Sequence, residues 1–135
     1  MGTAKKILVV DDEQDVRTYL TALLTDAGYE VETAVNGMVA LEQVRAAKPA
    51  LVSLDITMPE KSGIGFYREM RKDPDLAAVP IVIVTGVVNP WASPSGSGNV
   101  NDFLSSRRNI APPDGYFEKP VDSEAYLAKV AELVE

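Results

Sequence analysis

Short runs of consecutive apolar residues alternate along this chain with longer segments in which apolar residues recur every three or four positions. The runs are rich in β-branched residues and end at charged residues, glycine or proline, which is typical of buried strands. The segment at 30–35 alternates apolar and polar residues instead, as an edge strand does. The pattern predicts strands at 7–10, 30–35, 51–54, 81–84 and 116–117.

The periodic segments predict amphipathic helices at 16–27, 38–47, 64–70 and 127–134, and the pattern allows a short helix around 100–108. Gly28 is a suitable C-terminal stop for the first helix, and either Asp122 or Ser123 can cap the last one. Strands that alternate with helices predict an α/β fold, a doubly wound five-stranded parallel sheet with helices on both faces. We expect one domain, with a core from about residue 5 to residue 134.

The composition excludes several kinds of functional site. Of 135 residues 13 are basic and 20 acidic, for a net charge of −7, and neither half is basic, so we expect no direct nucleic-acid contact. The chain has no cysteine and no histidine, which excludes thiolate sites, zinc–histidine sites and histidine-containing triads. Its apolar runs are too short for a membrane span of ~20 residues or for a secretory signal, so we expect a cytoplasmic protein without membrane contact.

Polar side chains follow four of the predicted strands. Asp11 and Asp12 follow the first, Asp55 the third, Thr85 the fourth and Lys119 the fifth. The carboxyl ends of parallel strands form the ligand site of an open sheet, so these five side chains should converge. Two carboxylates ~4 Å apart repel by ~4 kcal/mol at an effective dielectric constant of about 20, and a hard cation would relieve that repulsion. Mg²⁺ suits the site, because it takes oxygen ligands and is held by one or two carboxylates.

Four motifs stand in order at those strand ends: Val9-Val10-Asp11-Asp12-Glu13, Asp55-Ile56-Thr57-Met58-Pro59 with Gly63, Thr85-Gly86, and Tyr116-Phe117-Glu118-Lys119-Pro120. Each is weak alone, but together they make the chain resemble the chemotaxis-regulator-like receiver domains of bacterial two-component response regulators. The resemblance implies a flavodoxin-like fold with strand order 2-1-3-4-5. It also implies that the chain is no enzyme beyond catalysing its own phosphorylation and dephosphorylation.

The resemblance implies a role for each acidic residue. Asp55 would be the phosphoacceptor, a carboxylate nucleophile that forms an acyl phosphate. Asp12 and Asp55 would bind Mg²⁺ directly, together with the backbone carbonyl of Thr57. Asp11 would act on the metal mostly through water.

The resemblance also implies a switch. Lys119 would pair with the phosphoryl oxygens and Thr85 would donate its hydroxyl to one of them, which would vacate space for the ring of Tyr116. The donor would be a phosphohistidine on a sensor histidine kinase or phosphotransfer protein, because this chain has no histidine. The signal would leave through a downstream effector protein or through a homodimer, since we expect a stand-alone receiver.

The segment 87–114 departs from the family pattern. One helix, two loops and a short strand would need only ~25 residues between Thr85 and Lys119, fewer than this chain has. We therefore expect the fourth helix, part of the family's usual output face, to be short or displaced. Trp91 and the basic pair Arg107-Arg108 make the segment either a partner or assembly surface or a passive loop with a locally packed Trp.

Other interpretations of the same residues stay open. Asp11 and Asp12 could cap a helix, and Glu13 could be a solvated residue of the first turn, favourable to the helix dipole. The chain could be a phosphohydrolase with an aspartyl-phosphate intermediate, although such enzymes usually carry the nucleophile on the first strand. It could also be an interaction module that works without phosphorylation, against which the acidic cluster and Lys119 argue.

Overall fold

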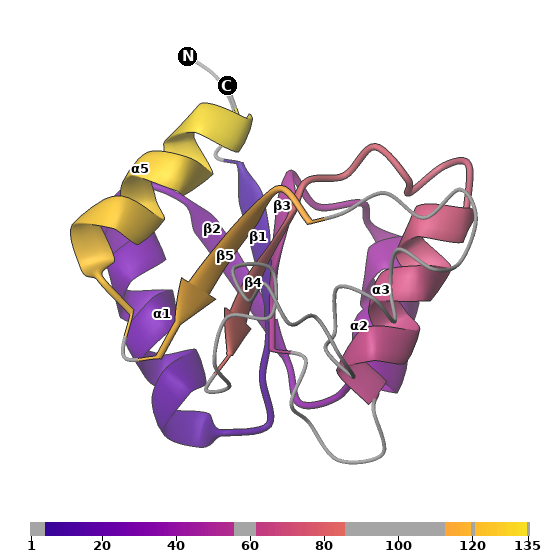
Figure 1. Cartoon of the computed structure of the whole chain (residues 1–135), viewed down its shortest axis with the longest axis horizontal. Helices are drawn as coiled ribbons and strands as arrows, with labels where there is room; N and C mark the ends of the chain where they lie inside the picture. Colours follow the sequence, from indigo (N-terminus) through magenta and orange to yellow (C-terminus); the bar gives the residue numbers. More distant parts are fainter. Residues whose placement is uncertain (1–4, 56–61, 86–112, 120, 135) are drawn as a thin grey trace, which may run out of the picture.

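The computed structural model describes residues 5–55, 62–85, 113–119 and 121–134, without the side chains of residues 62, 64 and 85. Its strands form one five-stranded parallel sheet in the order β2-β1-β3-β4-β5 (Figure 1). They are β1 (Lys6–Val10), β2 (Glu30–Ala34), β3 (Leu51–Leu54), β4 (Ile81–Thr85) and β5 (Gly115–Glu118). All five predicted strands and the predicted order are confirmed.

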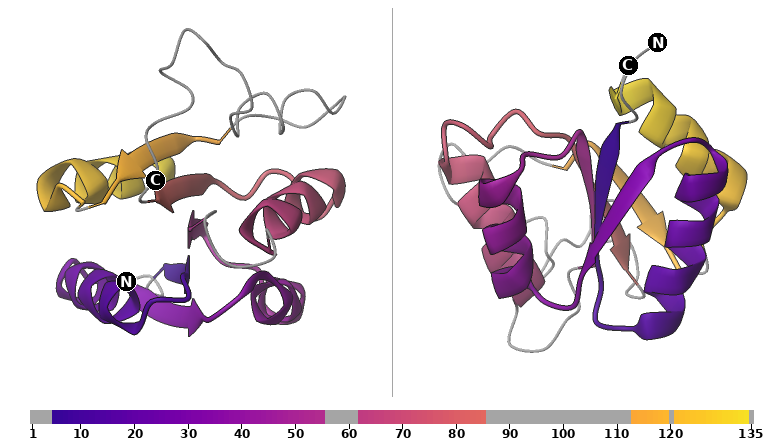
Figure 2. Two further views of the ribbon diagram at one scale, coloured as in Figure 1. Left: turned by 60° about the horizontal axis from the view of Figure 1, so that its bottom comes forward. Right: turned by 180° about the vertical axis from the view of Figure 1, so that it is seen from behind.

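Helices cover both faces of the sheet, as the alternation predicted. Those described are α1 (Gln14–Asp26), α2 (Gly37–Ala46), α3 (Ser62–Lys72) and α5 (Ser123–Val134). Helices α1 and α5 lie on one face, and α2 and α3 lie on the other (Figure 2). No helix among the described residues is long and apolar enough to cross a membrane.

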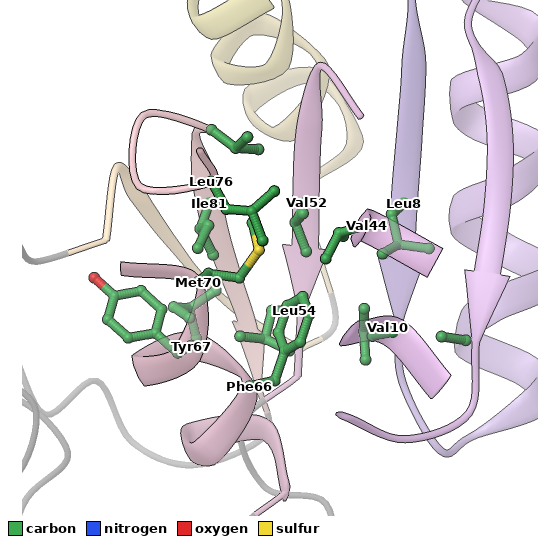
Figure 3. Close-up of a cluster of buried hydrophobic side chains, with 14 residues drawn as sticks. Leu8, Val10, Val44, Val52, Leu54, Phe66, Tyr67, Met70, Leu76 and Ile81 are labelled. Atoms are coloured by element: carbon green, nitrogen blue, oxygen red, sulfur yellow. The ribbon is translucent and has the colours of Figure 1, made fainter. Parts of the chain in front are cut away.

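The central strands are mostly apolar because helices bury both of their faces, and the one polar residue within β3, Ser53, is itself buried. In β1, Leu8 and Val10 pack towards α2 and α3, in a cluster with Leu54, Phe66 and other side chains (Figure 3). The pleat turns Ile7 and Val9 to the opposite face, where they meet a second cluster built on α1 and α5. β2 lies at the edge of the sheet, and of its residues only Ala34 is fully buried.

Local signals fix the helix ends. Gly28 has φ +98°, a conformation that glycine adopts without strain just after α1. The Asn36 side chain accepts a hydrogen bond of 2.8 Å from the Val39 amide, so Asn36 caps α2, which starts one residue earlier than predicted. At α5 the Asp122 carboxylate accepts from the Ala125 amide at 3.1 Å, which selects Asp122 over Ser123 as the cap.

Several expectations lie outside the described residues. These are the backbone carbonyl of Thr57, the short helix around 100–108, Trp91, and the pair Arg107-Arg108. Only the last two residues of the segment 87–114 are described. One of them, Asp114, continues the ladder of β5 by donating its amide to the Ile81 carbonyl at 2.8 Å.

A buried arginine holds the start of β5 against the rest of the fold. The Arg71 guanidinium donates to the Asp114 carboxylate at 2.9 Å and to the carbonyls of Ala77 and Val79 at 3.0 Å each. It also lies over the ring of Tyr67, 5.2 Å from its centroid. The apolar pattern did not indicate this network, because a single Arg on an amphipathic helix is typical of a surface residue.

Candidate functional site

The strand register brings the first two aspartates together. Val10 of β1 pairs with Leu54 of β3, so the next residue of each strand, Asp11 and Asp55, leaves the sheet at the same level. The Asp55 amide donates to the Val10 carbonyl at 2.9 Å. Both carboxylate residues are buried, with exposed fractions of 1% for Asp11 and 2% for Asp55, whereas the neighbouring Asp12 is exposed.

The carboxylates of Asp11, Asp12 and Asp55 form a group that could hold a metal ion. One oxygen from each lies within 4.8 Å of the other two, as the sequence predicted for a cation site. The residues fit such an ion, because they offer three carboxylates, two of them buried, and carboxylate oxygens are the ligands that a hard cation prefers. A divalent ion between them would also relieve the repulsion of their negative charges.

Lys119 lies next to the triad, at the end of β5. Glu118 pairs with Thr85, which places Lys119 one residue beyond the end of β4. Its ammonium Nζ is 3.0 Å from Asp11 Oδ2 and 3.5 Å from Asp55 Oδ2. These two distances confirm the sequence-based expectation that Lys119 lies close to Asp11 and Asp55.

Burial and charge act in opposite directions on these groups. Burial raises the pKa of Asp11 and the nearby Asp55 carboxylate raises it further, against the lowering by the Glu13 amide and by Lys119. Burial also acts to lower the pKa of Lys119, but Glu13, Asp11 and Asp55 outweigh it and the pKa is raised. The surroundings thus favour the charged form of Lys119 and disfavour the charged form of Asp11.

Glu13 is a member of the site that sequence reasoning missed. Its Oε1 lies 2.7 Å from Lys119 Nζ, the shortest of the three carboxylate distances to that ammonium. Lys119 holds the pKa of Glu13 below its usual value. The side chain is exposed, as expected, but it is ion-paired and not simply solvated. The signal available in the sequence was its position directly after Asp11-Asp12, together with the prediction of a lysine at the same site.

The start of α1 also differs from the capping interpretation. Glu13 occupies the N-cap position, and no side chain caps the helix there. Instead, Asp11 Oδ1 accepts a hydrogen bond of 2.9 Å from the Glu13 amide, and the Arg17 guanidinium donates to the Asp11 carbonyl at 2.7 Å. These contacts fix the loop that carries the acidic residues rather than the helix end.

The two predicted switch residues lie on neighbouring strands. Tyr116 pairs with Ile83, two positions before Thr85 on β4, and its half-buried ring packs against the cluster below α2 and α3. Burial, with a smaller contribution from Glu118, raises the pKa of the Tyr116 phenol to about 12. The Thr85 side chain lies outside the described part of the chain.

Comparison with known proteins agrees with this geometry. A family model, the response regulator receiver domain, matches residues 7–106. Protein Rrf1 of Nitratidesulfovibrio vulgaris is 33% identical over 125 residues, which cover 93% of this chain and 79% of that protein. Chemotaxis protein CheY4 of Vibrio cholerae superposes with a TM-score of 0.77 at 27% identity, over 97% of this chain and 99% of that one.

Longer relatives match as well. The probable transcriptional regulator ycf27 of Pyropia yezoensis is 48% identical over 130 residues, which cover 96% of this chain and 47% of that protein. The chain spans about half the length of the ycf27 relatives that it matches.

The chain belongs to the response regulator receiver family. It is a receiver domain of two-component signalling, a class of domain distinct from the classical enzymes, with an acidic pocket for phosphoaspartate signalling formed by Asp11, Asp12 and Asp55. Receiver domains of such systems interact with histidine kinases.

Proposed function

We propose that this chain accepts a phosphoryl group onto Asp55 from a phosphohistidine of a cytoplasmic histidine kinase or phosphotransfer protein. The single observation that carries the proposal is the position of Asp55. Its buried carboxylate lies within 4.8 Å of two further carboxylates and 3.5 Å from the Lys119 ammonium. A nucleophile between a cation site and a fixed positive charge suits phosphoryl transfer, which depends on positioning and on neutralising phosphoryl oxygens.

Mg²⁺ is the metal that the triad supports best, since all three available ligand atoms are carboxylate oxygens. Asp12 and Asp55 would hold it directly with the carbonyl of Thr57, and Asp11 would hold it through water. When bound, the ion would neutralise charge on the phosphoryl oxygens and reduce the repulsion between the carboxylates.

The protein groups supply the rest of the step. An oxygen of the Asp55 carboxylate forms a bond to phosphorus while the bond from phosphorus to the donor imidazole nitrogen breaks, and the imidazole leaves with that electron pair. Lys119 pairs with one phosphoryl oxygen, and Thr85 donates its hydroxyl to another. Hydrolysis of the acyl phosphate by water later returns the Asp55 carboxylate and inorganic phosphate.

The output of the switch is a change in protein contacts. Movement of the Thr85 hydroxyl towards the phosphoryl group would free space for Tyr116, and the altered surface would bind an effector protein or a second copy of the chain. Residues 1–135 would act as one receiver domain, in which the segment 87–114 distinguishes the partner.

Intact mass spectrometry tests the proposal directly. Incubation with Mg²⁺ and acetyl phosphate should add one phosphoryl group to the wild type and none to Asp55→Asn. Asp15→Asn is the matched control, because Asp15 is an exposed carboxylate at the start of α1, outside the triad, and should label normally. Equal labelling of the Asp55→Asn variant at an acid-stable position would contradict the assignment.

A further inference from the structure

We propose that Glu13 is a holding site for the Lys119 ammonium, which keeps this cation beside the acidic pocket but away from the space that a divalent ion must enter. The inference rests on the proposed Mg²⁺ site and adds a positioning residue to it. Its basis is an unequal set of distances: Lys119 Nζ is 2.7 Å from Glu13, 3.0 Å from Asp11 and 3.5 Å from Asp55.

Lys119 and a divalent ion compete for the same group of carboxylates. The ammonium lies 3.0 Å from Asp11 Oδ2 and 3.5 Å from Asp55 Oδ2, two of the three carboxylates that could hold the metal. A divalent ion among these carboxylates would repel Lys119 and neutralise the negative charge that attracts it. Glu13 lies outside the group of carboxylates that could hold the metal, so its charge stays available to Lys119.

The loop geometry keeps Glu13 in position for this role. Its amide is bonded to Asp11 Oδ1 at 2.9 Å, and its carbonyl accepts from the Arg17 amide at 3.1 Å as the first bond of α1. The backbone of Glu13 is therefore held by Asp11 on one side and by the first turn of α1 on the other. These two contacts do not depend on which partner Lys119 has.

The surroundings favour this ion pair over one that is fully solvated. Glu13 and Lys119 line a cavity of about 640 Å³ whose other walls include the apolar side chains of Val16, Tyr19 and Val121. The Lys119 side chain is only 17% exposed, against 60% for Glu13. Apolar walls reduce solvent screening on one side of the contact, so the pair should contribute near the upper end of the range for exposed pairs.

Without Glu13, the ammonium has only Asp11 and Asp55 as partners and should move further into the triad. The expected result for Glu13→Gln is a Kd for Mg²⁺ that is about two- to five-fold weaker, the factor that a surface ion pair supplies. Part of any such change is the simple loss of one negative charge near the site. Asp15→Asn measures that part, because Asp15 lines the same cavity and forms no ion pair with the described residues.

A double-mutant cycle read by titration calorimetry with Mg²⁺ isolates the role of the pair. It compares wild type, Glu13→Gln, Lys119→Met and the double variant. Lys119→Met alone should tighten Mg²⁺ binding. In that background Glu13→Gln should weaken binding no more than Asp15→Asn does in the wild type. The same fold loss in both backgrounds would overturn the inference and leave the metal site intact.

A second readout follows the ammonium itself. In ¹⁵N NMR of the Lys side chains, the Lys119 signal should persist at saturating Mg²⁺ in the wild type, as for an ammonium in a stable ion pair, and disappear in Glu13→Gln. A signal that persists equally in both proteins would overturn the inference. If the wild type binds no Mg²⁺ at all, the proposed metal site fails and the inference fails with it, an outcome that calorimetry alone identifies.

Discussion

Arg71 and Asp114, 43 positions apart in the chain, meet in a 2.9 Å ion pair that joins the end of α3 to the start of β5. The same oxygen, Asp114 Oδ2, also accepts the Ile81 amide at 2.9 Å, at the first residue of β4. One carboxylate thus serves a helix and a strand at once. Because β5 is a short edge strand and nowhere fully buried, its register depends on this anchor more than on core packing.

Replacement of Arg71 should therefore be costly. Arg71→Met would leave Asp114 without its cation and the carbonyls of Ala77 and Val79 without that donor. We expect the free energy of unfolding to fall by about 2–4 kcal/mol in urea titration. Arg45→Met is the matched control, since the one ion pair of Arg45 with the described residues is an exposed 4.0 Å contact with Glu69, and the substitution should change stability by less than about 0.5 kcal/mol. Equal effects of the two substitutions would contradict the assigned role of Arg71.

Two glycines should respond to alanine with opposite signs. Gly28 has φ +98° and open space where the added methyl group would lie, so Gly28→Ala suffers only backbone strain and should lose about 1–2 kcal/mol. Gly65 lies inside α3 with equal space and no such strain, so Gly65→Ala should gain about 0.5–1 kcal/mol from helix propensity. Urea midpoints measure both, and a loss at Gly65 would show a hidden steric conflict.

The raised pKa of Asp11 predicts a pH-dependent cost in the metal-free protein. Because the folded state raises this pKa above the ordinary value of 3.8, the folded protein binds the proton more tightly than the unfolded chain does. The free energy of unfolding therefore falls as pH rises from the unfolded-state pKa to the folded-state pKa. Asp11→Asn removes the cost and should stabilise the fold by about 1 kcal/mol at pH 7 in EDTA. The gain should shrink below about pH 3.5, where Asp11 is protonated in both states.

Asp12→Asn provides the comparison for that experiment. Asp12 is exposed, so its substitution should change metal-free stability by less than about 0.5 kcal/mol. A stability gain for Asp11→Asn that is the same at both pH values would assign the effect to packing and not to the buried charge.

The proposed switch predicts that Thr85 controls Tyr116. Beryllofluoride, a phosphoryl mimic, should shift the Tyr116 ring resonances in the wild type because the Thr85 hydroxyl moves towards it. Thr85→Val keeps the shape and loses the hydroxyl, so the shift should disappear while beryllofluoride still binds. Ring resonances that move equally in both proteins would show that the two residues are not coupled.

The apolar pattern was sufficient for the strands and the described helices, because burial on both faces leaves a nearly unambiguous signal in β1, β3 and β4. It was sufficient for the convergence of Asp11, Asp55 and Lys119 too, since parallel register follows from the topology. The pair Asn36-Gly37 suits a turn as well as a helix start, and the hydrogen bond from the Val39 amide to the Asn36 side chain shows that Asn36 is a cap.

Pairings between distant segments could not be predicted. The contact of Glu13 with Lys119 spans 106 positions, and that of Arg71 with Asp114 spans 43. Both depend on where long side chains point after the sheet has formed, and charge patterning along the sequence carries no such information. The sequence interpretation therefore predicted which carboxylates and which lysine come together, but not the groups that hold the lysine and the edge strand.

The described fold begins and ends on the same side of the molecule, near the amino end of β1, whereas the acidic pocket lies at the carboxyl ends of the strands (Figure 1). β1 begins at Lys6 and runs towards the pocket, while α5 runs back and finishes at Val134. The five residues of β1 place the amino end of this strand ~16 Å from its carboxyl end, where the pocket lies. A fluorescent protein or a second domain fused at either terminus would therefore leave the approach to Asp55 open, so tagged forms can serve in the phosphorylation and binding experiments without obstructing the donor.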